Sequence, residues 1–307
     1  MRIVFMGTPD FAKESLEAVY NAGYEILGVV TNPDKPKGRG MKMMASPVKE
    51  FAIEKNIKIY QPLKVKNNVE FIQEIKDLNP DIICVVAYGK ILPKEILEIP
   101  KLGCINVHGS LLPKYRGAAP IQWSVLNGDK VTGVTTMYME KGLDTGDILE
   151  TKEYEIGIND TAGEVFDTLA EMGGKLILDT LEKAEKGELH PIKQDDSKSS
   201  YAKMLDKSMC NIDFSKTNLQ VHNQVRGLSP WPVASTKLNG KVLKIFETRL
   251  TEGKGKPGEI LNTNPLTIAC GEGAVVVNTV QLQGKKKMDS KAFLQGHKLE
   301  KGTVIGE

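Results

Sequence analysis

The stretch Asp81-Ile-Ile-Cys-Val-Val-Ala87 decides the fold class, because its apolar residues follow one another without a polar gap. An alternating pattern would indicate a strand with one wet face, whereas a continuous run indicates a strand that is covered on both faces. Arg2–Gly7, Ile26–Val30 and Leu102–Val107 have the same character. All four runs are therefore predicted to be buried strands of one sheet.

Helical patterns separate these runs along the chain. They cover Pro47–Lys55 behind a Ser46 cap, then Val65–Leu78 and Ala118–Leu126. Alternation of strands and helices builds an open parallel sheet, and such sheets bind ligands beyond the carboxyl ends of their strands. The predicted fold class is α/β, with a Rossmann-like open parallel sheet in an N-terminal domain.

The pattern of strands and helices continues through one further helix and then changes. Val131–Met139 and Asp147–Ile156 are predicted to be two further strands, and a helix starts at the capping box Thr161-x-x-Glu164. The polar stretch that follows has no period and is typical of a linker. Beyond it lie a helix at 218–226 and short strands separated by turn signals, which favour a small β-barrel. We expect a catalytic domain at 1–189, a linker at 190–207 and a C-terminal barrel at 208–307.

Charge and composition describe an ordinary globular protein. The 307 residues include 41 Lys and Arg and 39 Asp and Glu, with a net charge of +2, 40% hydrophobic and 26% charged residues. These values exclude a disordered or strongly basic chain. From Met204 onward, however, 15 Lys and Arg stand against 9 Asp and Glu, so this third carries +6 and the rest −4. The asymmetry is consistent with a nucleic-acid partner or with simple scatter.

The cysteines and the chain start point to a reducing compartment. The four cysteines have no C-x-x-C spacing, and none lies in a metal-like repeat with histidine, so we expect no metal. The first apolar run turns polar at Gly7-Thr-Pro-Asp10, too early for a signal peptide. Uncharged stretches fall short of the roughly 18 residues of a membrane span. We expect a cytoplasmic protein with no membrane contact.

The densest group of reactive side chains follows the strand at 102–107. Residues two apart on a strand share a face, so Asn106 and His108 are predicted to point into one space at its carboxyl end. His108 can exchange protons near neutral pH, and the Asn106 amide can donate to an oxyanion. Asp144, between Gly142 and Gly146, is a candidate to orient the histidine. The alternatives are a structural histidine and a plain turn aspartate.

Two motifs resemble the folate-dependent formyltransferase family. The first is Asn106-x-His108-Gly-Ser-Leu-Leu-Pro-x-Tyr-Arg-Gly117. The second is Gly142-Leu-Asp144-Thr-Gly-Asp-Ile-Leu149, whose first aspartate lies 36 residues after His108. The resemblance implies that Asn106, His108 and Asp144 are the catalytic trio and that the formyl donor is 10-formyltetrahydrofolate. It also implies folate contacts at two segments, through Ser110, Leu111, Leu112 and Pro113 and through Val86, Tyr88 and Gly89.

The resemblance extends over the whole chain to the branch of this family that formylates the methionine on initiator methionyl-tRNA. It includes the segments 4–12, 31–49 and 227–232, and it implies an oligonucleotide-binding-like C-terminal barrel. The loop Asp34–Met44 carries four cations that the branch would use on the acceptor stem: Lys35, Lys37, Arg39 and Lys42. With Pro36, Gly38 and Gly40 in it, this loop is predicted to be neither helix nor strand. Without the resemblance, a solvated surface loop would be the favoured interpretation.

Three other functions remain open at this point. A formyltransferase acting on a nucleotide-linked amino sugar would not need the basic loop. A nicotinamide dehydrogenase is disfavoured, since Gly7-Thr-Pro-Asp10 lacks the second and third glycines of the dinucleotide fingerprint. A non-catalytic RNA-binding module would use the basic clusters, including Lys285–Lys287, but leaves the catalytic trio unexplained. We expect a monomer whose partners are folate and tRNA.

Overall fold

The computed structural model describes residues 1–37 and 42–306 and divides into two compact units. The N-terminal unit comprises Met1–Pro120, Thr132–Tyr154 and Phe166–Ala202. The second unit comprises Ile121–Val131, Glu155–Val165 and the chain from Lys203 onward. Each unit is described by itself below. Within the described residues, no helix is both long and apolar enough to cross a membrane.

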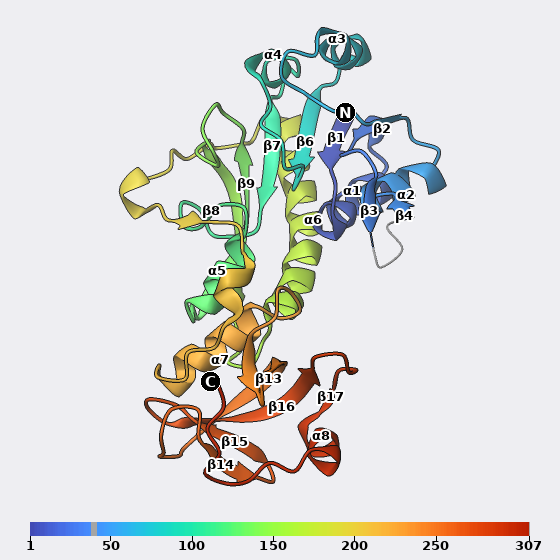
Figure 1. Ribbon diagram of the computed structural model, residues 1–307. Coiled ribbons are helices and arrows are strands. Elements are labelled where there is room, and N and C mark those ends of the chain that lie inside the picture. The colour runs from blue at the N-terminus through green and yellow to red at the C-terminus, as the bar shows by residue number, and fades with distance from the viewer. Residues whose placement is uncertain (38–41, 307) are drawn as a thin grey trace. The chain divides into compact units, whose positions relative to one another are not determined.

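The N-terminal unit is built on a seven-stranded sheet (Figure 1). Its strands run in the order β10-β9-β7-β6-β1-β2-β5. The five strands from β7 to β5 pair in parallel, as the continuous apolar runs predict. Their bounds are β1 Arg2–Gly7, β2 Glu25–Val30, β5 Ile59–Tyr60, β6 Ile82–Val86 and β7 Cys104–His108, followed by β9 Val131–Tyr138 and β10 Ile148–Glu155.

The edge of the sheet beyond β7 departs from a purely parallel arrangement. Strand β9 pairs with β7 antiparallel, with Asn106 opposite Met137 and His108 opposite Thr135. Strand β10 lies on the outer side of β9 and ends the sheet. The predicted α/β class is confirmed, but the sheet is mixed at this edge.

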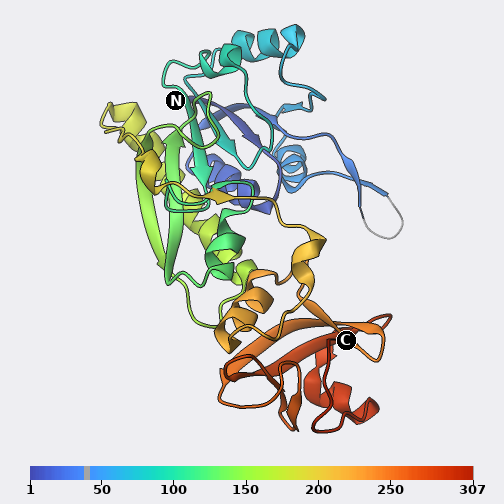
Figure 2. The ribbon, with the colours of Figure 1, turned by 60° about the vertical axis from the view of Figure 1, so that its left-hand side comes forward.

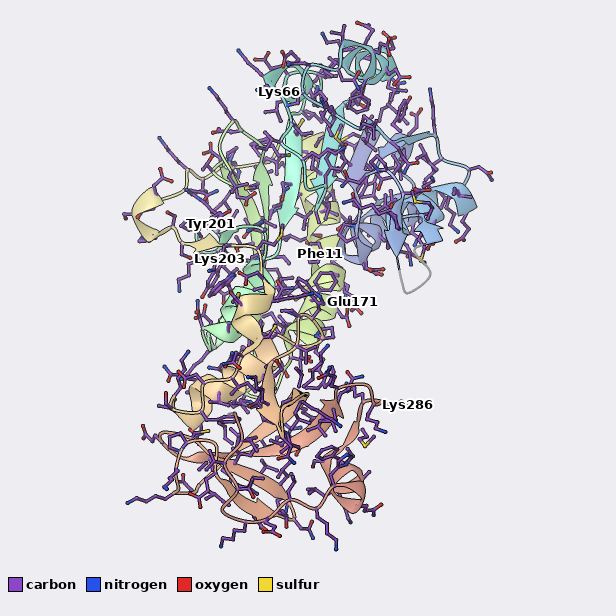
Figure 3. The ribbon with its side chains drawn as sticks, in the orientation of Figure 1. Phe11, Lys66, Glu171, Tyr201, Lys203 and Lys286 are labelled. Carbon is purple, nitrogen blue, oxygen red and sulfur yellow. The ribbon has the colours of Figure 1, made fainter. Side chains whose placement is uncertain are left out.

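Helices cover both faces of the sheet. They are α1 Asp10–Asn21, α2 Pro47–Glu54, α3 Val69–Leu78, α4 Lys94–Leu97 and α6 Ala162–Lys186, whereas α5 Pro120–Leu126 belongs almost wholly to the second unit. On one side α1 meets α6, where the Phe11 and Phe166 rings pack edge to face with centroids 5.5 Å apart; Figure 3 labels Phe11 beside Glu171. Gly173 lets α6 pack closely on β7, because a Cβ there would lie 3.0 Å from the Val107 side chain. The strands β1, β6 and β7 are thus buried from both sides.

Local hydrogen bonds explain where the helices begin. Ser46 Oγ accepts from the Lys49 amide, which confirms the predicted cap of α2. The capping box at Thr161 and Glu164 is also confirmed. Helix α3 starts four residues later than predicted, because Asn68 caps it by accepting from the Phe71 amide.

The prediction of no regular structure at 34–44 was wrong for its described part. Strands β3 Lys35–Lys37 and β4 Lys42–Met44 form an antiparallel hairpin, which we call the basic hairpin; it projects from the N-terminal unit (Figure 2). Pro36 stands opposite Met43. Proline is tolerated in an edge strand wherever its missing N–H would not face a partner. A two-stranded ribbon consists only of edges, so this proline does not prevent pairing.

The second unit contains an antiparallel sheet in the order β12-β13-β16-β15-β14, with β17 beside β16. Its elements are α7 Asn218–Gly227, β12 Ser235–Leu238, β13 Lys241–Thr251, β14 Ile260–Thr263, β15 Leu266–Ala269, β16 Ala274–Leu282, β17 Met288–Asp289 and α8 Ser290–Gly296. Near the C-terminus, the Ile305 amide donates to the carbonyl of Gly258, two residues before the edge strand β14. The Gly306 amide donates to the carbonyl of Lys237 in the opposite edge strand, β12. The curved sheet is the predicted barrel in half-open form.

Candidate active site

The candidate site lies at the carboxyl end of β7, next to the point where strand order reverses between β6 and β1. Such reversal points are where open α/β sheets bind ligands. Asn106 is partly exposed and His108 is 7% exposed, both on β7. Asn106 Oδ1 is buried and accepts no hydrogen bond from any residue that the structure describes. A buried acceptor without a partner costs about 1–3 kcal/mol, so this oxygen is left available to a hydrogen-bond donor of a bound molecule.

The two ring nitrogens of His108 have different surroundings. Nε2 donates to the carbonyl oxygen of Tyr115 at 2.9 Å, since a carbonyl can only accept. Nδ1 lies 3.9 Å from Oδ2 of Asp144, beyond hydrogen-bond length. In the neutral ring, Nε2 therefore carries the proton and the Nδ1 lone pair is free to take another. A proton on Nδ1 would place an imidazolium beside the Asp144 carboxylate.

Asp144 reaches the histidine from a turn of unusual backbone geometry. Its φ of 52° lies in the left-handed region, where residues other than glycine are strained. Gly146 is required two residues later, because a Cβ there would collide with the carbonyl of Tyr138. Oδ2 accepts from the Gly117 amide at 2.8 Å, which holds the carboxylate in place. The predicted trio of Asn106, His108 and Asp144 is thus drawn from β7 and one turn.

The segment after β7 is held by its own backbone contacts. Ser110 Oγ donates to the Lys114 carbonyl at 2.7 Å, and Thr135 Oγ1 donates to the Ser110 carbonyl at 2.7 Å. Leu112 is buried, and Leu111 packs at the bare face of Gly133. Pro113 follows Leu112 through a cis peptide bond. Ser110 is therefore occupied within its own turn, and any folate contact of these residues stays a prediction.

The residues after β6 lie at the same end of the sheet. Val86 is fully buried in the strand, and Gly89 has a φ of 74° that favours glycine. The Tyr88 ring is 2% exposed, and burial raises the pKa of its hydroxyl to about 12. The Tyr88 carbonyl accepts from Asn32 Nδ2, which also donates to Thr8. The backbone of Tyr88 thus lies at the carboxyl end of the strands, while its side chain belongs to the core.

The base of the basic hairpin is fixed by one carboxylate. Both carboxylate oxygens of Asp34 accept hydrogen bonds from Lys49 Nζ, Oδ1 at 2.9 Å and Oδ2 at 2.8 Å. Oδ1 also accepts one from Gln61 Nε2 at 2.9 Å. Lys35 is exposed, and Lys37 pairs with Lys42 through the backbone. Arg39 lies outside the described residues. Burial, and then the charge of Lys35, lowers the pKa of Lys90, so two cations repel each other beside this hairpin.

Metal and thiol chemistry find no support in the described residues. No group of three or more His, Cys, Asp or Glu side chains there could hold a metal ion. All four cysteines are free, and burial raises the pKa of the Cys104 thiol to about 12. A buried, protonated thiol is a poor nucleophile.

Three supporting groups of this site were not predicted from the sequence. The Tyr115 carbonyl and the Gly117 amide act through the backbone, which no residue type announces. Gln194 lies in the polar stretch predicted as a linker, yet its side chain is 6% exposed and bonds to the Asp144 turn. Nothing in the local sequence distinguishes it from the polar residues around it.

Comparison with known proteins supplies the family. The formyl transferase model matches residues 1–181, and the model of the formyl transferase C-terminal domain matches residues 204–298. The chain belongs to the formyl transferase family. The catalytic-domain match contains Asn106, His108 and Asp144, and the second match begins just after β11 at Tyr201–Ala202.

Some members of the family match this chain over its full length and over their own. Among them, the methionyl-tRNA formyltransferase of Clostridium novyi (strain NT) is 51% identical over 309 residues, covering 99% of this chain and 100% of its own. That of Clostridioides difficile (strain 630) is 49% identical over 310 residues, with both chains fully covered.

Solved structures of other formyl transferases share the fold at low identity. HypX from Aquifex aeolicus, in complex with tetrahydrofolic acid, gives a TM-score of 0.65 at 18% identity, covering 99% of this chain and 51% of that one. An N-formyltransferase from Helicobacter canadensis, solved with folinic acid and dTDP-3-aminofucose, gives 0.67 at 22% identity, covering 93% and 99%.

Proposed function

We propose that this formyl transferase moves the formyl group of 10-formyltetrahydrofolate to the amino group of methionine on initiator methionyl-tRNA. The observation that carries the proposal is the identity of about half of all positions, over both domains, with relatives named methionyl-tRNA formyltransferase. The product is N-formylmethionyl-tRNA, which serves translation initiation. The folate acts as a substrate and no metal is needed.

The reaction joins the methionine nitrogen to the formyl carbon and breaks the bond from that carbon to the folate nitrogen. Attack by the neutral amine gives a tetrahedral carbon bearing an oxyanion. The attacking nitrogen must then lose a proton, and the leaving folate nitrogen must gain one. One residue that accepts and returns a proton satisfies both needs.

His108 is suited to this transfer in the proposed mechanism. Its Nε2–H is fixed by Tyr115, so Nδ1 is the nitrogen that takes the proton. Asp144 stabilises the resulting imidazolium from 3.9 Å. Asn106 is assigned the donation to the oxyanion, through the N–H groups of its Nδ2. We assign these three residues the catalytic roles, and the segments 86–89 and 110–113 the folate contacts.

Recognition of tRNA is assigned to the basic hairpin and the second unit. Lys35, Lys37, Arg39 and Lys42 contact the acceptor stem in this proposal. The mutual repulsion of Lys35 and Lys90 is relieved when a phosphate binds between cations, which favours an anionic partner. Lys285, Lys286 and Lys287 are exposed in the turn after β16 and offer a second phosphate contact.

The boundaries 1–189, 190–207 and 208–307 are proposed as the catalytic, linking and tRNA-docking parts. The linking part is not free along its length, since residues 192–202 hydrogen bond to the N-terminal unit. We further propose that the protein is a monomer in the cytoplasm.

The test is direct transfer. The purified protein is mixed with 10-formyltetrahydrofolate and initiator methionyl-tRNA, and formylmethionyl-tRNA is measured by acid-gel shift. A parallel reaction contains a nucleotide-linked amino sugar instead of tRNA. Transfer to tRNA alone supports the proposal. Transfer to the sugar alone would make the protein a sugar formyltransferase and overturn the proposal.

A further inference from the structure

A buried glutamine joins the two loops that carry the candidate catalytic groups. Gln194 Nε2 donates to the carbonyls of Asp144 at 2.9 Å and Gly146 at 2.7 Å. Its Oε1 accepts from Arg116 Nε at 3.1 Å and Nη2 at 2.8 Å. One side chain therefore spans from the Asp144 turn to the loop after β7.

The chemistry of these four bonds fixes the orientation of the amide. Rotating it by 180° would set its NH₂ against the guanidinium of Arg116 and its oxygen against two carbonyls. All four hydrogen bonds would be lost inside a buried site. A residue that only filled space would not need an amide nitrogen that donates twice on one side and an oxygen that accepts twice on the other.

Gln194 belongs to a segment, residues 192–202, that we call the strap. The strap pairs with Ile148 at one end and, through Tyr201 and Ala202, with β8 Arg116–Gly117 at the other; Figure 3 labels Tyr201. Between them, Ser200 Oγ accepts from the Tyr115 amide at 2.9 Å. The strap thus contacts both Tyr115, which holds His108, and the turn that carries Asp144.

We propose that Gln194 is a positioning residue that sets the distance from Asp144 to His108. The Asp144 turn has a left-handed residue and no helix or strand of its own, so an outside contact is needed to hold its backbone. The Gly117 amide holds the Asp144 carboxylate by a hydrogen bond. Arg116, one residue earlier, donates to Oε1 of Gln194. The proposal rests on the catalytic role of Asp144 proposed above.

The decisive variant is Gln194→Glu. The new carboxylate still accepts from Arg116, so the strap keeps that contact, but it cannot donate to Asp144 and Gly146 and repels their carbonyls. Gln194→Ala removes both contacts. We expect kcat to fall about 10- to 100-fold in each, the typical cost of a misplaced catalytic group. KM for both substrates should stay within about twofold, because neither substrate is bound by this side chain.

Asp196→Asn is the matched control. Asp196 accepts from the same Arg116 Nη2 but is exposed and does not touch the Asp144 turn. The asparagine retains an acceptor, so its kcat should equal that of the wild type. Wild-type kcat in folded Gln194→Glu would overturn the proposal.

A double-mutant cycle with Asp144→Asn shows whether the glutamine acts through the aspartate. Once the carboxylate charge is gone, Gln194→Glu should cause little further loss of kcat. A full additional loss would mean that it acts elsewhere, and would overturn the proposal.

An NMR measurement separates this proposal from the proposed function. The ¹H–¹⁵N signals of the His108 ring should shift both in Gln194→Glu and in Asp144→Asn, even if the wild type fails to formylate methionyl-tRNA. Unchanged ring signals would overturn the positioning role, whatever the activity.

Discussion

Asp144→Asn tests the proposed mechanism with the smallest change of shape. The asparagine oxygen still accepts from the Gly117 amide, so the turn keeps its bond and loses only the charge. In the wild type, Oδ2 lies 3.9 Å from His108 Nδ1 and the carboxylate is 14% exposed. With an effective dielectric of about 20, this separation gives an imidazolium stabilisation of about 4 kcal/mol. The expected loss of kcat is therefore about 10³-fold.

Single-turnover transfer measures this loss without a contribution from product release. Enzyme in excess is mixed with saturating 10-formyltetrahydrofolate and labelled methionyl-tRNA, and formylated product is followed in time. Circular dichroism and the melting temperature confirm that the variant is folded. A rate within tenfold of the wild type would refute the reasoning, because the charge at 3.9 Å would then not act on the reacting state. Asp144 would in that case be only a turn residue.

Three further predictions concern the oxyanion donor, the basic hairpin and the ion pair below it. Asn106→Asp, which keeps the shape and removes the donors, should lower kcat about 10²- to 10³-fold in the same transfer assay; retained activity would remove Asn106 from the trio. Lys35→Ala should weaken tRNA binding and reduce the slope of log Kd against log salt by about one, and Arg39→Ala should impair transfer while folate binding is unchanged. Lys152→Ala, on exposed β10, is the control, and an equal effect there would contradict a specific contact. Hydrogen bonds from Lys49 and Gln61 lower the pKa of Asp34, so its stabilising effect is present above the ordinary carboxyl pKa and is lost as pH falls through the lowered value. Asp34→Asn should therefore reduce stability to urea at pH 6, with the difference starting to shrink below the ordinary carboxyl value of 3.8 and disappearing only below the lowered pKa; a pH-independent difference would argue against the ion pair.

The strands of the N-terminal sheet could be predicted because burial on both faces leaves a local mark, a continuous apolar run such as that around Ile83. The spacing of Asn106 and His108 likewise placed both on one strand. The basic hairpin was missed because proline discourages pairing in most strands, whereas a ribbon made only of edges tolerates Pro36.

The contacts that complete the site could not be predicted for a different reason. Gln194 meets Arg116 across 78 residues of sequence, and its four bonds depend on where the backbone of a strained turn lies. A backbone amide such as that of Gly117 is present in every residue type except proline, so its use as a donor leaves no mark in the sequence. Such contacts follow from the tertiary arrangement, and no local pattern of polarity encodes them.

The strap also has a consequence for how the enzyme becomes active during synthesis. The Tyr115 amide and Ser200 are 85 residues apart. At the usual elongation rate of about 5–20 residues per second, Ser200 is made roughly 4–17 s after Tyr115. A nascent chain made as far as residue 144 therefore carries Asn106, His108 and Asp144 before the strap has been made. A fragment ending at residue 189 would preserve every catalytic side chain and lack the segment that aligns them, so it should fold its sheet and remain inactive.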